Sequence, residues 1–228
     1  MSTDSQDFSG KELAKLYHER FSAEELDGKR QLWEALYQGF FVRFIRPTDT
    51  VLDLGAGSCE FINVCHASNK IAVDLNPETK LWARDARVVL ASSDNMPEVG
   101  TESVDVVFTS NFFEHLPDKR TLINTFNECV RVLRPEGRML VLMPNLRYVG
   151  HRYWDYFDHH LPLTHVSLVE GLKMAGFDID RVIPRFVPYT VKDSPMKVRR
   201  GLVRAYLRLP IVWPLFGKQM FVAAHKAA

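Results

Sequence analysis

The chain has 228 residues, of which 46% are hydrophobic, and its 29 basic and 28 acidic side chains give a formal net charge of +1. This length and composition suit one large folded domain and exclude a disordered or collagen-like chain, while the balanced charge provides no overall field for nucleic acid. No apolar run reaches the roughly 18 residues of a transmembrane helix, and the polar, acidic N-terminus predicts no signal peptide. The three cysteines (Cys59, Cys65, Cys129) lack metal-ligand spacing and predict free thiols in a reducing compartment, hence a cytoplasmic protein.

The predicted elements alternate between helix and strand. Residues 10–45 have helical patterning without strand signals, and we expect an N-terminal helical cap over residues 1–46. A helix is predicted from Asp118, its N-cap, to Leu133, with Pro135-Glu136-Gly137 as the stop, and another from Ser167 to Ala175. Short, continuous apolar runs predict strands buried on both faces: Val51–Leu54, Ile71–Val73, Val88–Ala91, Val104–Thr109 and Met139–Met143, followed later by strand-like runs at Phe177–Val187 and Met220–Ala224. This alternation predicts an α/β fold with right-handed crossovers.

The first predicted strand runs into Gly55-Ala56-Gly57, where two glycines allow a tight turn and close approach of the backbone to a ligand. Glu60 occupies the slot that a dinucleotide site fills with a small residue, and its charge would repel a phosphate. Together with Asp53, it suits a positively charged ligand without phosphate, such as S-adenosylmethionine. An NAD-dependent oxidoreductase is therefore disfavoured, and a tight turn without a ligand is the bland alternative.

Two further strand ends carry candidate ligand contacts. Asp74, with Leu75 beside it, closes the second strand about 20 residues past the glycines, where a carboxylate accepts hydrogen bonds from ribose hydroxyls. Asp94 and Asn95 follow the third strand, where either accepts from an adenine amino group while Met96 packs the ring. The alternatives are a turn-capping Asp74 and a polar turn at residues 92–96.

The motifs VLDLGAGSCEF, IAVDLNP, SSDNMP, SVDVVFTSNFFEHLPD and RVLRPEGRMLVLMPN, in this order, resemble a class I S-adenosylmethionine-dependent methyltransferase of the type-11 branch. The resemblance implies an α/β, doubly wound, seven-stranded, mostly parallel sheet whose last strand is antiparallel. We expect one methyltransferase domain over residues 1–228, with a cofactor-binding half at 47–145 and an acceptor side at 146–228. Carried over residue by residue, the resemblance implies these cofactor contacts: Asp53, Gly55 and Gly57 at the methionine end, Asp74 at the ribose, Asp94 at the adenine, Ser110 and Asn111 after the fourth strand, and Tyr17 from the N-terminal helix.

The fourth strand leads into Glu114-His115, at the edge where ligands bind in parallel sheets. Methyl transfer to a hydroxyl needs alignment and a base, and the pKa of histidine suits His115 to that work. The alternative is that the pair fixes the loop before the Asp118 helix. The pattern also resembles the E-x-x-E-H of quinone-pathway O-methyltransferases, which can bind a divalent cation. Asn111 replaces the first glutamate, which weakens such a site, and we expect no metal.

Residues 145–165 follow the fifth strand at the same edge and are rich in aromatic and histidine side chains. Such loops build substrate pockets, and aromatic rings beside Arg and Asp suit a sugar or a phenol. The alternative is a lid whose aromatics pack together. The predicted substrate contacts are Arg147, Tyr153, Trp154, Phe157 and His159; His160 and His165 are second-choice bases, which Asp158 would orient.

The leading hypothesis is S-adenosylmethionine-dependent methyl transfer to a small-molecule acceptor, with a hydroxyl of a saccharide, phenol or other secondary metabolite favoured. A non-catalytic S-adenosylmethionine-binding regulatory domain is the alternative from another class. A nucleic-acid methyltransferase is disfavoured, because no N/D-P-P-Y/F motif follows the fourth strand and the charge is near zero. The basic, amphipathic stretch 192–216 is either a helix packed on the sheet or a peripheral membrane contact, which would suit a lipid-linked acceptor.

Overall fold

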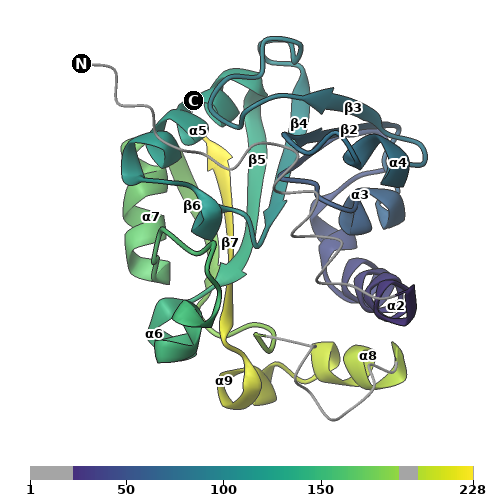
Figure 1. Cartoon of the computed structure of the whole chain (residues 1–228), viewed down its shortest axis with the longest axis vertical. Helices are drawn as coiled ribbons and strands as arrows, with labels where there is room; N and C mark the ends of the chain where they lie inside the picture. The colour runs from purple at the N-terminus through teal and green to yellow at the C-terminus, as the bar shows by residue number, and fades with distance from the viewer. Residues whose placement is uncertain (1–22, 190–199, 228) are drawn as a thin grey trace.

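The computed structural model describes residues 23–189 and 200–227, which form a sheet of seven strands in the order β3-β2-β1-β4-β5-β7-β6 (Figure 1). Neighbouring strands from β3 to β5 pair in parallel, whereas β7 is antiparallel to both β5 and β6. The predicted doubly wound sheet with an antiparallel last strand is thereby confirmed. The strands are β1 (Thr50–Leu54), β2 (Asn69–Asp74), β3 (Arg87–Leu90), β4 (Val104–Ser110), β5 (Leu133–Pro144), β6 (Phe177–Ile183) and β7 (Gln219–Lys226).

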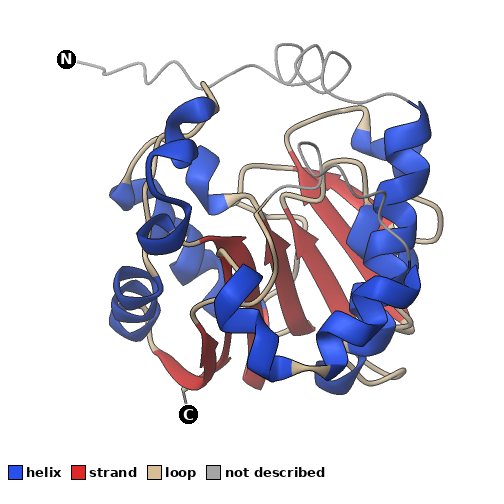
Figure 2. Cartoon of the chain, turned by 90° about the horizontal axis from the view of Figure 1, so that it is seen from below, coloured by secondary structure: helices blue, strands red, loops and turns tan. Residues whose placement is uncertain are grey.

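Helices cover both faces of the sheet (Figure 2). On one face, α5 and α7 contribute Phe126 and Leu168 to a buried apolar cluster. On the other face, α2 and α3 pack over the sheet, and the ring of Phe61 stacks on that of Phe108 with centroids 3.5 Å apart. The described helices are α2 (Ala23–Gly39), α3 (Glu60–Val64), α4 (Thr79–Trp82), α5 (Lys119–Val132), α6 (Leu146–Val149), α7 (His165–Met174), α8 (Arg200–Arg208) and α9 (Trp213–Phe216), with 3-10 turns η1 (Phe41–Phe44), η2 (Phe113–His115), η3 (Gly150–Asp155) and η4 (Pro210–Val212).

The predicted helix boundaries differ from the observed ones at two places. Asp118 does cap α5, because its carboxylate accepts the Thr121 amide at 2.8 Å. The helix ends at Val132, however, and Pro135-Glu136-Gly137 lie within the range of β5, since Leu133 has already turned to an extended conformation. The other helix, α7, begins at His165 and not at Ser167, because Thr164 caps it through a reciprocal pair of hydrogen bonds with Ser167.

The N-terminal part of the chain is described only in part. Residues 23–44 form α2 and η1, in agreement with the predicted helical patterning, and α8 packs against α2 from the far end of the sequence. Tyr17 and residues 192–199 lie outside the described residues, so the predicted contact of Tyr17 with the cofactor stays a prediction. The division into a cap, a cofactor half and an acceptor side also stays a prediction.

Candidate functional site

The candidate site lies at the edge of the sheet where the parallel strands end, because strands of the same direction finish at the same edge. The loops that follow β1, β2 and β4 meet there. They bring together the glycine loop Gly55–Gly57, Asp74 at the end of β2, and Ser110 with Asn111 at the end of β4. The sequence therefore placed its main cofactor candidates on loops that the topology gathers at one edge.

The glycine loop has a backbone that only glycine adopts readily. Gly55 and Gly57 have φ values of +69° and +49°, and a Cβ built on Gly55 would lie 2.5 Å from the ring of Phe112. The amide of Gly57 donates to Oδ2 of Asp74 at 2.7 Å, and the amide of Asn76 donates to Oδ1 at 2.8 Å. Asp74 thus fastens the end of β2 to the loop after β1, which fixes the floor of a ligand site.

Carboxylates gather around this loop. Asp53 is 4% exposed, and its pKa lies well above the usual value because of burial, with Glu60 and Asp74 adding repulsion. Burial also raises the pKa of Asp74. Lys29 forms an ion pair with one of these carboxylates, with its Nζ 3.2 Å from Oε1 of Glu60. A ligand with a sulfonium and an ammonium would relieve this crowding of negative charge, so the residues present fit S-adenosylmethionine.

The remaining cofactor candidates differ in exposure. Leu75 is exposed, whereas Ala56 is buried. Asp94 accepts the hydroxyl of Ser92 in a turn, and Asn111 donates from its side chain to Ser110 Oγ at 2.9 Å. Asn95 and Asn111 are exposed, while Met96 is fully buried in the core and does not offer the ring surface that the sequence predicted for it.

The end of β4 carries the candidate base. Glu114 and His115 lie on the 3-10 turn η2, and the Glu114 carbonyl accepts the amides of His160 and Leu161 at 2.8 and 3.1 Å. His115 Nδ1 lies 2.9 Å from the carbonyl oxygen of Asp158 and 3.2 Å from its Oδ2. Asp158 therefore contacts His115, a pairing that the sequence did not predict, and its predicted role in orienting His160 or His165 stays a prediction. The loop after β5 folds back onto the end of β4, which sequence distance does not reveal.

The two acidic groups set the charge of His115. Burial opposes the charged form of its ring, but the hydrogen bond to Asp158 and the charges of Glu114 and Asp158 outweigh burial and raise its pKa. Glu114 is 1% exposed, and burial raises its pKa to about 7, although His115 acts in the opposite direction. Its Oε2 has no hydrogen-bond partner among the described residues. The buried Glu114 and the partly exposed His115 therefore form an electrostatically interacting acid and base at this edge of the sheet.

A third side chain joins this pair. One potential ligand atom each from Glu114, His115 and His159 lie within 4.8 Å of one another, and His159 Nδ1 lies 2.8 Å from the Tyr153 carbonyl. Two imidazoles and a carboxylate form a donor set that suits transition metals. Sequence reasoning weighed only Asn111, Glu114 and His115, because His159 is far away in the chain. The expected absence of a metal stays a prediction.

The acceptor candidates of residues 145–165 are spread over buried and exposed positions. Tyr153 is fully buried, and its hydroxyl donates to the Leu161 carbonyl at 2.6 Å, so it supports the loop and does not face a substrate as predicted. His165 lies in the first turn of α7, beside the side chain of Asn145, and burial with Arg147 lowers its pKa. The exposed candidates are Arg147, Trp154, Phe157 and His160, and His159 is 8% exposed.

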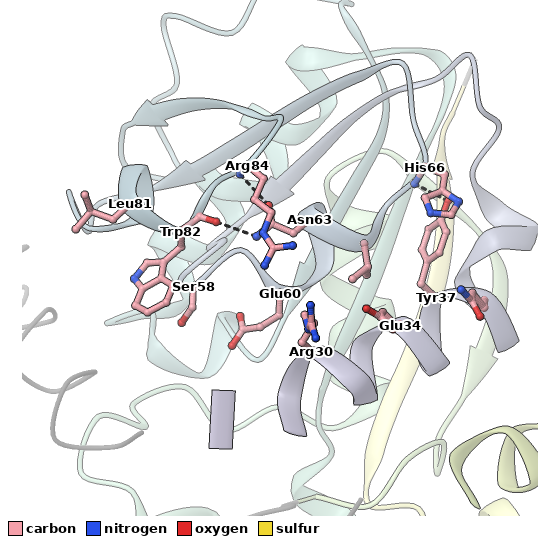
Figure 3. Close-up of a pocket in the computed structure, with 12 residues that line it drawn as sticks. Arg30, Glu34, Tyr37, Ser58, Glu60, Asn63, His66, Leu81, Trp82 and Arg84 are labelled. Carbon is pink, nitrogen blue, oxygen red and sulfur yellow. Dashed lines mark hydrogen bonds between the residues drawn. The ribbon is translucent and has the colours of Figure 1, made fainter. Parts of the chain in front are cut away.

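A separate cavity of about 550 Å³ lies away from these residues, between α2, α3 and α4 (Figure 3). Glu60 and Asn63 line it from α3, and the Asn63 side chain donates to the Trp82 carbonyl at 2.8 Å. The predicted acceptor residues are not among its lining. Ser58 and Glu60 belong to the motif VLDLGAGSCEF, and the other lining residues were not singled out from the sequence because they belong to no motif.

Comparisons with known proteins concern the fold and the segment that carries the glycine loop. Residues 52–141 match the family model described as a methyltransferase domain, a segment that runs from β1 almost to the end of β5. The chain also resembles a SAM-dependent methyltransferase from Archaeoglobus fulgidus (21% identity, 93% and 99% of the two chains, TM-score 0.67). It likewise resembles one from Mesorhizobium loti (16% identity, 84% and 98%, TM-score 0.60). None of the curated protein sequences matches the chain.

Another similar structure is the chain that the Trm112 methyltransferase activator of Haloferax volcanii binds in their complex (16% identity, 98% and 99%, TM-score 0.65). These similarities are in fold, and the family match covers residues 52–141, which lie within the predicted cofactor half. The chain therefore has the fold of S-adenosylmethionine-dependent methyltransferases, as the motifs predicted, and the family match lies within that fold. More particularly, the matched segment is a methyltransferase domain of the type-11 family.

The basic stretch predicted over 192–216 is described from residue 200 onward, where it forms α8, η4 and α9. Within the described ranges, none of the helices combines the length and apolarity that a membrane crossing requires.

Proposed function

We propose that the protein methylates a hydroxyl group of a small-molecule acceptor, a saccharide, a phenol or another secondary metabolite, with His115 as the base. The observation that carries this proposal is the pairing of His115 with Asp158 at the end of β4. S-adenosylmethionine, when bound, supplies a methyl group made electrophilic by its sulfonium. The glycine loop and Asp74 would hold it, and Ser110 with Asn111 would line it.

The contact with Asp158 supports the base role through the tautomer of His115. A carbonyl oxygen only accepts, so the Nδ1 that contacts it carries the proton, and the lone pair of the neutral ring is on Nε2. The side chain is 31% exposed, which leaves the ring accessible from solvent. As the oxygen–carbon bond formed and the methyl–sulfur bond broke, with the neutral thioether as the leaving group, the proton of the acceptor hydroxyl would pass to Nε2. Asp158 would orient the ring and stabilise the imidazolium that results.

The loop after β5 would supply the acceptor contacts. Trp154 and Phe157 are 56% and 85% exposed, which is unusual for large rings, and these rings would stack on a sugar or phenol. Arg147 would contact an acidic or hydroxylated group. His160 and His165 are the second candidates for the base, and Tyr153 keeps only a supporting role.

The acceptor class is tested by transfer of a labelled methyl group from S-adenosylmethionine to sugar nucleotides, phenols and lipid-linked saccharides, with DNA and RNA as further acceptors. We expect label on a hydroxyl oxygen of one of the small molecules. Label on nucleic acid alone would contradict the proposal. Binding of S-adenosylmethionine without transfer to any acceptor would favour the non-catalytic regulatory domain.

A further inference from the structure

The segment from α8 to α9 stands at the same edge of the sheet as the candidate site. It joins the end of β6 to the start of β7, and β6 runs parallel to β5 because β7 is antiparallel to both. Gln219, the first residue of β7, pairs with Pro144, the last residue of β5. Figure 1 shows α8 and α9 at the bottom of the view, below the sheet, with α6 nearby. A surface on this segment therefore borders the edge where an acceptor would arrive.

The turn between α8 and α9 exposes large apolar side chains. Ile211 is 82% exposed, Leu215 70%, Phe216 60% and Leu209 52%. Large side chains at such exposure, four within eight residues, form an apolar patch of the kind that marks an interaction site.

Buried contacts with the rest of the protein hold the segment that carries this patch. Trp213, which lies between the exposed residues, is 5% exposed and donates from its indole nitrogen to the Tyr206 carbonyl at 2.9 Å. Its ring packs on Phe186, with centroids 5.0 Å apart. Arg185 donates to the carbonyls of Gly217 and Leu215 at 2.9 and 3.1 Å. Buried contacts therefore hold this segment in a fixed position in which its apolar side chains face the solvent.

The flanks of the patch are basic. Residues 200–218 include Arg200, Arg204, Arg208 and Lys218 and contain neither aspartate nor glutamate. Arg200 pairs with Glu34 and Arg204 with the uncharged Gln38, both on α2. Apolar side chains flanked by cations match the interface of an anionic bilayer, where the apolar groups enter the headgroup region and the cations meet phosphates.

We propose that this surface, made of Leu209, Ile211, Leu215 and Phe216 with their basic flanks, docks the protein on an anionic lipid bilayer. Docking there turns the candidate site edge toward the membrane, so an amphiphilic acceptor reaches it from the lipid surface. The proposal that the protein docks on a bilayer depends only on the exposed side chains described above. The proposal of an amphiphilic acceptor also depends on the proposed methyl-transfer function.

The test is co-sedimentation with vesicles of phosphatidylcholine, with and without phosphatidylglycerol, at low and high salt. We expect the wild type to sediment with the anionic vesicles, and less so as salt rises. The double variant Ile211→Asp, Phe216→Asp should sediment roughly tenfold less, because it removes apolar contact and adds repulsion. Arg208→Glu should weaken binding in the same direction. The matched control is Leu81→Asp, which places the same charge at a residue that is 80% exposed on α4.

Wild type that stays in the supernatant with anionic vesicles overturns the proposal, as does a double variant that sediments like the wild type. Size-exclusion chromatography tests whether a second copy of the chain covers this surface instead. If the wild type is a dimer, the double variant is a monomer and neither binds vesicles, the surface is an interface between two copies and the proposal is wrong. Calorimetric binding of S-adenosylmethionine by the same variants reports on their folding. Sedimentation needs no acceptor, so failure of methyl transfer and failure of docking are distinguishable.

Discussion

Asp74 accepts the amides of Gly57 and Asn76, and it is also the predicted ribose contact. Asp74→Ala removes both the loop anchor and the ribose acceptor. We expect it to weaken S-adenosylmethionine binding by about 1–3 kcal/mol, since hydrogen bonds to a charged group are lost. Isothermal titration calorimetry measures this, with Lys80→Ala on the exposed side of α4 as the control. Unchanged affinity would refute the ribose role.

Asp158 tunes His115, and the pH profile should show it. Glu114 and Asp158 raise the pKa of His115 above its ordinary 6.5 against the effect of burial, and the ring of His159 also faces it at 5.1 Å between centroids. A base must be neutral, so kcat/KM should rise with pH through this raised pKa. Asp158→Asn removes one negative charge that favours the imidazolium. The rise should therefore move to lower pH in this variant, and a move to higher pH would contradict the pairing.

The donor set of Glu114, His115 and His159 allows a second test of the base role. If His115 takes the proton directly, protein dialysed against a chelator keeps its methyl-transfer activity, and added zinc or manganese does not raise it. Activity that disappears on dialysis and returns with one of these ions would instead make His115 a metal ligand. The measurement is the initial rate of methyl transfer before and after dialysis, with metal content followed by atomic emission.

At the residue scale, the sequence predicted what is local and missed what loops bring together. The glycines and Asp74 follow strands directly, so a motif and a spacing are enough to place them. Asp158 contacts His115 across 43 residues of chain, and that contact depends on how the loop after β5 folds back. Tyr153 was expected to face a substrate because it lies among aromatic residues, but composition does not say which ring is turned inward.

At the scale of elements, Asp105 links three strands at the edge opposite the site. Its Oδ2 accepts the Thr50 amide at 2.7 Å and a guanidinium nitrogen of Arg134 at 2.5 Å, so it joins β4 to the start of β1 and to β5. Burial acts to raise the pKa of Asp105, but Arg134 and the Thr50 amide outweigh it and lower the pKa below its ordinary 3.8. The stabilising charge is therefore present above pH 3.8 and is lost as the pH falls through the lowered pKa.

We expect Asp105→Asn to lower the free energy of unfolding by about 1–2 kcal/mol at pH 7, because the hydrogen bonds of a charged carboxylate are lost. The loss is no larger because Arg134 is half-exposed and solvent weakens its ion pair with Asp105. The deficit relative to wild type should shrink as the pH falls below about 4, because the Asp105 carboxylate of the unfolded chain then takes up a proton, whereas that of the folded protein does so only at lower pH. Thermal unfolding at both pH values checks this. The control is Asp85→Asn, whose side chain is 85% exposed and 3.9 Å from Lys70, and which should have little effect. A deficit that grows in acid would contradict the linkage.

The strands and the two helices were predicted to within one or two residues at most of their ends. The continuous apolar runs mark β1 to β4 this closely because burial on both faces leaves little choice of residue, but β5 begins at Leu133, six residues before the predicted Met139. The start of α7 was missed because the reciprocal hydrogen bonds of Thr164 and Ser167 cap the helix before its apolar pattern begins. The 3-10 turns η2 and η3, which position Glu114 and Tyr153, are too short to leave a periodic pattern.

At the scale of the whole molecule, the alternation of elements predicts a parallel α/β sheet, and the number of strands came from the resemblance to type-11 methyltransferases. Because β7 lies between β5 and β6, the segment from α8 to α9 lies at the edge that also carries the cofactor and acceptor loops, which no single motif indicates. The near-zero net charge of the chain averages over an acidic cofactor loop and this basic segment, so it does not describe either surface.

The most direct test of the account is the turnover of His115→Ala measured beside its affinity for S-adenosylmethionine, with the exposed His151→Ala as the matched control. If His115 is a base that contacts the acceptor and not the cofactor, its loss should lower turnover by about 10²–10⁴-fold. The calorimetric affinity for S-adenosylmethionine should be nearly unchanged. Turnover equal to that of the wild type would contradict the central role of His115 and would place the base elsewhere.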